Sequence, residues 1–141
     1  MNSKTILIVL ISLCFLLISI NVTASNQEEM TSLQINEING GFGGVTALIV
    51  NTGEVTAENF AISIFVEGGF GGKIDISQIC SGCGDCGTTI PVGETKAEST
   101  REAGFIIGFG PIDIMVTASA ENADLVSAAT TGFVIGPIIL I

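Results

Sequence analysis

Residues 45–68 read VTALIVNTGEVTAENFAISIFVEG. Two runs rich in β-branched residues flank Asn51-Thr52-Gly53-Glu54, where Asn and Gly tolerate a positive φ. The pattern predicts a strand, a tight connection and a second strand, that is, a β-hairpin. The second run alternates with a period of two, as expected where one face of a sheet is buried. Its predicted inward residues are Phe60, Ile62, Ile64 and Val66.

The composition of the whole chain is that of one small folded domain. It has 141 residues, of which 48% are hydrophobic and 13% charged, so it is no disordered acidic tail despite a net charge of −10. Its 14 acidic residues outnumber four basic ones, and it contains no His. This balance repels phosphate backbones and anionic lipid surfaces, so we do not expect nucleic acid as a partner.

The first 24 residues have the anatomy of a secretory signal peptide. Lys4 supplies the positive start, residues 5–20 form an uncharged apolar core, and Val22-Thr23-Ala24 offers short residues for cleavage after Ala24. The alternative is an uncleaved anchor, because the core is only a little shorter than the roughly 20 residues that span a bilayer. We expect cleavage and a secreted or cell-surface protein, which contacts a membrane only if this segment is retained.

After a flexible lead at residues 25–31, we expect a single domain over residues 32–141. Beyond the central segment, further strands are predicted at residues 32–39, 73–79, 112–118 and 125–131. In the third of these, Ile112, Ile114 and Val116 are expected to face inward.

The string Gly-Gly-Phe-Gly-Gly occurs at residues 40–44 and again at 68–72. Because glycines permit sharp reversals, each string predicts a turn, with its Phe buried against the edge of the domain. No helical periodicity follows either string, which argues against a phosphate-binding loop.

The stretch between the cysteines and the third predicted strand is less regular. Pro91-Val92-Gly93-Glu94 predicts a turn, and residues 95–101 suit an exposed strand, with a short helix over residues 94–103 as the competing interpretation. An apolar face is then expected to return with Phe105, Ile107 and Phe109.

Residues 132–141 are apolar to the end of the chain. They are too few to span a membrane as a helix, so we interpret them as a closing strand interrupted at Gly136-Pro137. The alternative is an exposed terminal strand that pairs with an edge of another subunit, through which the chain would self-associate.

The central segment also resembles a known family. A strand ending in Val50-Asn51-Thr52-Gly53, then Ala57-Glu58-Asn59 and residues 60–64, is similar to the central hairpin of the cell-adhesion-related domain CARDB and its immunoglobulin-like relatives. The resemblance covers roughly residues 31–141, and its later part is similar to tails of secreted or surface proteins from archaea. It implies a small extracellular β-sandwich that acts as a spacer, adhesive or assembly module, with no catalytic residues to carry over.

The most distinctive chemistry lies in Cys80-Ser81-Gly82-Cys83-Gly84-Asp85-Cys86. Three thiols at this spacing can surround one centre, but zinc and iron–sulfur sites normally take four protein ligands, and only Asp85 or a second molecule would supply the last. In an exported protein, oxidation is the commoner outcome. We predict a loop closed by one disulfide among Cys80, Cys83 and Cys86, and no cofactor. The cysteines are a departure from the family pattern.

The sequence thus predicts an all-β, immunoglobulin-like antiparallel sandwich of about seven strands behind a signal peptide. Without His there is no Ser-His or Cys-His pair, and we expect no enzymatic activity. Carboxylate pairs such as Glu28/Glu29 and Glu98/Glu102 suit a solvated surface, and no loop has the spacing of a calcium site. The expected function is a secreted or cell-surface structural or adhesion module that contacts other extracellular proteins. The alternative is a small metal-binding or redox protein that uses the three cysteines.

Overall fold

The computed structural model describes residues 29–81 and 88–141 of the chain. Within these residues the regular structure consists of ten β-strands and a single turn of 3-10 helix, η1 (Thr100–Glu102). All the strand pairs within the sheets are antiparallel, which confirms the prediction of an all-β protein. The strand number exceeds the expected seven or so, because short strands form in the connections and at the chain end.

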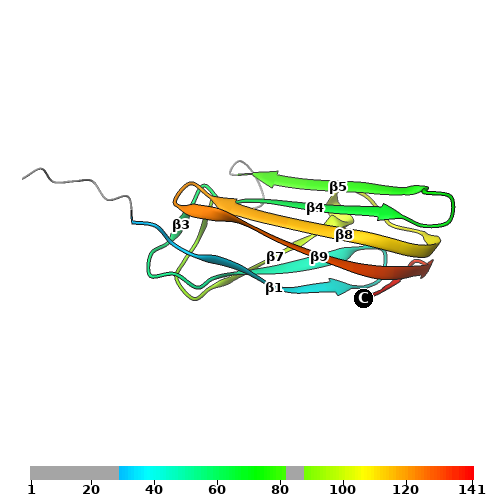
Figure 1. Ribbon diagram of the computed structural model, residues 1–141, viewed down its shortest axis with the longest axis horizontal. Coiled ribbons are helices and arrows are strands. Elements are labelled where there is room, and N and C mark those ends of the chain that lie inside the picture. Colours follow the sequence, from blue (N-terminus) through cyan, green and yellow to red (C-terminus); the bar gives the residue numbers. More distant parts are fainter. Residues whose placement is uncertain (1–28, 82–87) are drawn as a thin grey trace, which may run out of the picture.

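The larger sheet contains five strands in the order β10-β9-β8-β4-β5. Their bounds are β4 (Ala61–Gly68), β5 (Ile74–Ser81), β8 (Gly108–Ala120), β9 (Ala123–Gly136) and β10 (Ile138–Leu140). The second Gly-Gly-Phe-Gly-Gly string joins β4 to β5 as a hairpin, and β8 and β9 form a longer hairpin. In Figure 1, β5 and β4 run along one side of the elongated molecule and β1 along the opposite side.

The smaller sheet contains three strands in the order β1-β2-β7. Their bounds are β1 (Leu33–Gly40), β2 (Val45–Asn51) and β7 (Thr95–Ser99). A separate two-stranded ladder joins β3 (Ala57–Glu58) to β6 (Thr89–Ile90), both of which belong to connections between the sheets. The architecture is therefore sandwich-like, with two antiparallel sheets and a shared core.

The predicted hairpin at residues 45–68 is wrong in its pairing, although both of its strands exist. β2 pairs with β1 and β7 in the smaller sheet, whereas β4 pairs with β5 and β8 in the larger one. The connection crosses the sandwich instead of turning back beside β2. Neither Asn51 nor Gly53 has a positive φ. A run of alternating residues indicates a strand, but it does not say which strand lies beside it.

The side chain of Asn51 holds the crossover in place. It is fully buried, and its amide nitrogen donates to the carbonyl oxygens of Val55 and Ile90, each at 2.8 Å. Its amide oxygen accepts from the Thr31 hydroxyl at 2.8 Å and from the Gly53 N–H at 3.0 Å. Asn51 thus joins the N-terminal segment, the crossover and the strand β6.

The core lies between the two sheets and consists mainly of β-branched side chains. The predicted inward residues of β4 and β8 are confirmed, since each is at most 2% exposed. These residues are Phe60, which immediately precedes β4, and Ile62, Ile64, Val66, Ile112, Ile114 and Val116. Val45, Ala47 and Ile49 of β2 belong to the same buried cluster. Burial of each large apolar side chain contributes about 1.5–3 kcal/mol, so this cluster is the main source of stability.

Three aromatic or aliphatic side chains expected inside are exposed instead. Phe105, Ile107 and Phe109 point outward, and Ile106 between them is only 2% exposed. The Ile106 N–H donates to the carbonyl of Gly43, in the turn between β1 and β2, at 3.0 Å, and this bond holds the segment against the smaller sheet. Of residues 94–103, the first part forms β7, and the helical alternative survives only as η1.

The two turn phenylalanines were also predicted to be buried, and this is wrong. Phe42 is exposed and Phe70 is 83% exposed. The reversals depend instead on backbone conformation, since Gly43 in the first turn and Gly69 in the second have φ near +73° and +74°. The two Phe side chains are therefore available on the surface.

One long side of the sandwich is closed by contacts between its sheets. At one end of β1, the Thr31 N–H donates to the Asn122 carbonyl at 2.7 Å. At the other end, the Ile139 N–H donates to the Gly41 carbonyl at 3.0 Å. β10 also pairs with β9, so the C-terminal strand is bonded on both sides within its own chain. Thr31, which the sequence pattern places in the flexible lead, takes part in this closure.

The predicted signal peptide, residues 1–24, lies outside the described residues. In the part of the chain that the structure describes, no helix is long and apolar enough to cross a membrane.

Candidate functional site

The outer face of the larger sheet carries the candidate functional site. Alternation along β8 buries its even-numbered residues from Gly110 to Ala118 and turns the odd-numbered ones away from the core. The register then aligns outward residues across neighbouring strands. Met115 lies beside Phe65 of β4, and Phe65 lies beside Ser77 of β5. Side chains distant in sequence therefore form rows across this face.

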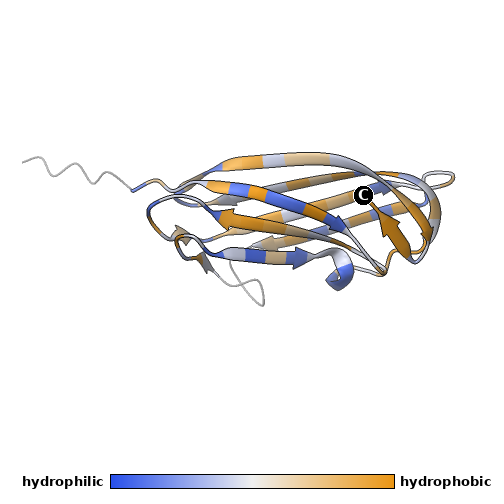
Figure 2. Ribbon diagram, turned by 90° about the horizontal axis from the view of Figure 1, so that it is seen from below, coloured by the Kyte–Doolittle hydropathy of each residue, from blue (hydrophilic) through white to orange (hydrophobic). Residues whose placement is uncertain are grey.

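One end of this face is apolar. We call the five residues Phe109, Phe133, Ile135, Ile138 and Leu140 the apolar end. β8 pairs with β9 and β9 with β10, so the registers place these residues on one surface. The rings of Phe109 and Phe133 meet edge to face, with centroids 5.3 Å apart, yet Phe109 remains 59% exposed. Figure 2 shows β10, beside the C mark, as hydrophobic along its length.

A row of three carboxylates crosses the same face next to the apolar end. We call Asp75 of β5, Glu67 of β4 and Asp113 of β8 the acidic row. The register places Glu67 directly opposite both Asp75 and Asp113. Like charges in such positions destabilise a sheet. Within the described residues these carboxylates form no hydrogen bond or ion pair, so the row offers unneutralised negative charge.

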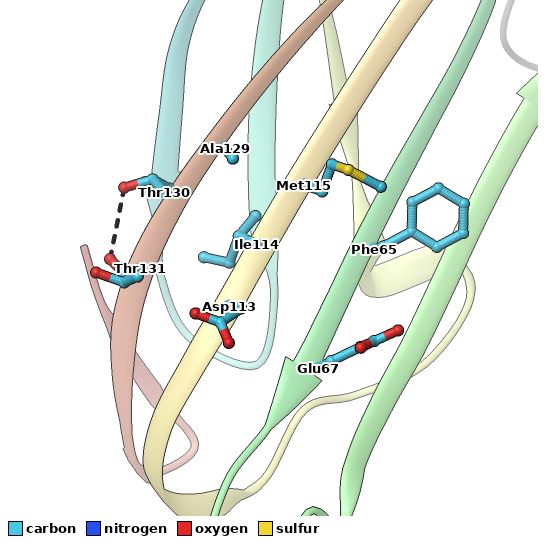
Figure 3. Close-up of a pocket in the computed structure, with 8 residues that line it drawn as sticks. All are labelled: Phe65, Glu67, Asp113, Ile114, Met115, Ala129, Thr130 and Thr131. Carbon is cyan, nitrogen blue, oxygen red and sulfur yellow. Dashed lines mark hydrogen bonds between the residues drawn. The ribbon is translucent and has the colours of Figure 1, made fainter.

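A hollow of about 630 Å³ lies over the centre of this face, between the acidic row and the next row of residues. Figure 3 shows Phe65 and Met115 beside one another, with Glu67 and Asp113 along the same strands. Thr131 lines the far side of the hollow. An apolar wall beside carboxylates suits a Lys or Arg side chain, whose stem packs on Phe65 and Met115 while its charged group meets the acids.

The predicted cysteine site is described only in part. Cys80 lies near the end of β5, is 4% exposed and faces the core opposite Ile62 of β4. It is not a free side chain. Cys83 and Cys86 lie outside the described residues, so the disulfide remains a prediction. Residues 29–81 and 88–141 contain no group of three or more His, Cys, Asp or Glu placed to hold a metal ion.

The carboxylate pair Glu98/Glu102 is not the solvated pair that the sequence indicated. Glu98 of β7 is only 7% exposed, whereas Glu102 is exposed. Burial raises the pKa of Glu98, an effect that Lys96 opposes and Glu102 reinforces. Of the other pair, Glu29 is exposed and Glu28 lies outside the described residues.

The chain matches no protein-family model, and no curated protein matches it significantly. The outer face must therefore be interpreted from its own residues. The sequence pattern does not single out the apolar end, because it assigns these side chains to a closing strand or to the core. The available signal was that residues 132–141 are apolar at odd and even positions alike, which indicates a strand with little polar surface on either face.

Proposed function

We propose that this protein is a non-enzymatic structural or adhesion module, secreted or held at the cell surface, that contacts other extracellular proteins through the outer face of its larger sheet. The expected immunoglobulin-like, CARDB-like character and the signal peptide are parts of this proposal. Two antiparallel sheets around one core support the first, and the apolar, singly charged start of the sequence supports the second.

The apolar end is the observation that carries the proposal. Isolated apolar residues are normal on a surface, but contiguous apolar patches with a polar border mark protein contact sites. Here, two Phe and three aliphatic side chains gather on three adjacent strands and are bordered by the acidic row. Aromatic side chains at the centre of such a patch usually supply much of the binding energy. The acidic border favours a basic partner.

The proposal is tested by localisation and site-specific cross-linking in the producing organism. We expect protease treatment of whole cells to reach the tagged full-length chain. A photo-cross-linking residue in place of Met115 should capture a surface or extracellular protein. The same residue in place of Gln34, which is exposed on β1 of the smaller sheet, should capture little.

A double substitution, Phe109→Ser with Phe133→Thr, should lower the cross-link yield by about tenfold while the fold, checked by circular dichroism, is kept. Leu125→Ser removes another exposed apolar side chain outside the apolar end and should leave the yield unchanged. Added salt should weaken capture because the acidic row is exposed. A chain retained inside the cell, or equal capture from both faces, would contradict the proposed function.

A further inference from the structure

We propose that the free edge of β5 is a strand-addition site, at which an extended segment of another extracellular protein pairs antiparallel to β5 and places Lys or Arg opposite Asp75. The inference rests on the proposed function and deepens it, because it names the mode of contact and the chemistry of the partner. Three observations support it: the outer sheet edges differ in how well they are protected, β5 has backbone groups that point away from its sheet, and the surface charge is negative.

The outer sheet edges differ in how well they are protected. On one side, the residues that flank β1 are hydrogen-bonded to the larger sheet, Thr31 to Asn122 in the β8–β9 turn and Gly41 to Ile139 of β10. On the other side, β7 has five residues, carries Lys96 and Glu98, and ends in η1. β5 has eight residues, pairs with β4 without a bulge and contains no Pro. Proteins usually shorten, charge or bend an exposed edge. β5 carries the charge of Asp75 but is neither short nor bulged, so it is the least modified of the outer edges.

The register identifies the unpaired backbone groups of β5. The Gly69 N–H donates to the Pro111 carbonyl at 2.7 Å, so the odd-numbered residues of β4 direct their backbone groups to β8. The even-numbered residues of β4 then bond to β5, where they face Ile74, Ile76, Gln78 and Cys80. Backbone groups alternate in direction along a strand. Asp75, Ser77 and Ile79 therefore direct their N–H and C=O groups to the outer edge of β5, where no residue within 29–81 and 88–141 pairs with them.

The side chains at this edge specify what kind of strand fits. Directly opposite residues of an antiparallel pair share a face, so an added strand contacts Ile79, Ser77 and Asp75 in turn. Ile79 is 65% exposed and favours an apolar residue. Asp75 begins the acidic row and favours a basic residue four positions further along the added strand. An Arg or Lys there would also reduce the repulsion between Asp75 and Glu67.

Charge argues for a different protein and against a second copy. The chain has 14 acidic and four basic residues, so two copies side by side repel one another. Of the basic residues that the structure describes, Lys73 immediately precedes β5 and has Gly69 four positions before it, Lys96 is held in β7, and Arg101 is held in η1. None of the three supplies an apolar residue and a base four positions apart in an extended segment that is available for pairing.

The test uses the full secreted chain and the synthetic peptide Ser-Thr-Val-Thr-Thr-Val-Lys-Thr, in which Val faces Ile79 and Lys faces Asp75. Its counterpart has Glu in place of Lys. We expect saturable NMR shifts at the amides of Asp75, Ser77 and Ile79, and slower hydrogen exchange at these three alternating amides alone. The Lys peptide should bind at least about fivefold more tightly than the Glu peptide, because opposite charges are replaced by like charges.

Two variants of β5 make the result specific. Ser77→Pro removes an outward N–H at an edge, where Pro is tolerated, and should abolish peptide binding, whereas Ser77→Ala keeps the N–H and should bind normally. Asp75→Asn keeps the backbone edge intact and should remove the preference for Lys over Glu. If the Ser77→Pro variant fails to fold, the Asp75→Asn variant still tests the inference through the preference for the Lys peptide over the Glu peptide.

Several outcomes would overturn the inference. They are equal binding of the two peptides, shifts at β7 in place of β5, or no shift at millimolar peptide. Concentration-dependent broadening of the β5 amides without peptide would show that a second copy is the occupant, and would equally overturn it. If the peptides fail while cross-linking from Met115 persists, only the strand-addition inference is lost and the proposed function stands.

Discussion

At the scale of single residues, Asn51 has the most demanding role in the fold. Its side chain makes four hydrogen bonds in a fully buried position, with two as donor and two as acceptor. Removal of the buried donor leaves the Ile90 carbonyl without this hydrogen bond, which is costly, whereas the Val55 carbonyl still accepts from the Thr31 hydroxyl at 2.8 Å. Only Asn, among side chains of this size, offers both a two-proton donor and an acceptor.

Asn51→Asp is therefore expected to lower the free energy of unfolding by about 3 kcal/mol or more, because the Ile90 carbonyl loses this donor, the Val55 carbonyl keeps only the Thr31 hydroxyl, and a carboxylate is buried beside both carbonyls. The measurement is urea denaturation, with a lowered midpoint and an unchanged slope. Asn36→Asp, at an exposed position of β1, should change the free energy by less than about 0.5 kcal/mol. Similar losses in the two variants would show that the Asn51 network is not what stabilises the crossover.

Glu98 gives the chain a distinct pH dependence. Burial raises the pKa of this carboxyl above its ordinary value of 4.5, so the folded state disfavours the ionised form. The contribution of the neutral acid to the free energy of unfolding is complete below the ordinary pKa, and it is lost as the pH rises through the raised pKa. Glu98→Gln should therefore match the parent protein in melting temperature below about pH 4 and exceed it at pH 7. A Glu94→Gln control at an exposed site should show no such divergence, and parallel pH profiles for Glu98→Gln and parent would contradict the prediction.

At the scale of elements, β10 depends on a close approach to β1. A Cβ atom added at Gly40 would lie 2.4 Å from the Ile139 carbonyl oxygen, which is far inside contact distance. The backbones of β1 and β10 can approach this closely only because position 40 has no side chain. The C-terminal strand is thus held by backbone contacts as well as by its pairing with β9.

Gly40→Ala should push β10 away and cost about 1–3 kcal/mol, as overpacking typically does. Hydrogen exchange at residues 138–140 should accelerate, while the central strand β4 keeps its protection. Gly41→Ala is the matched control, since its nearest neighbouring atom would be 3.8 Å away. If both variants leave β10 equally protected, the close approach at Gly40 is not required.

At the scale of the whole molecule, the two long sides of the sandwich are unlike. The side of β1 and β10 is closed by hydrogen bonds between the sheets, whereas β5 is left as a regular edge on the opposite side. The outer face of the larger sheet carries the apolar end and the acidic row. A partner strand added at β5 would extend this face directly, which links the proposed contact surface to the proposed strand-addition site.

The sequence by itself determined the main strands and, for β4 and β8, their inward residues. Alternation in β4 and β8 named Phe60, Ile62 and Ile114 as core residues, because a period of two is a local property of an extended chain with one buried face. The Gly-rich strings identified the turns for a similar reason, since the conformation of Gly43 is a property of that residue.

Only the tertiary structure decided which strands are neighbours and what the outer face presents. Nothing within residues 45–68 distinguishes a hairpin from a crossover, because the partners of Asn51 include Thr31 and Ile90, far away along the chain. The acidic row is equally hidden, since Asp75, Glu67 and Asp113 are brought together only by the registers of three strands. Pairing is a contact between distant segments, so its consequences appear only once the chain has folded.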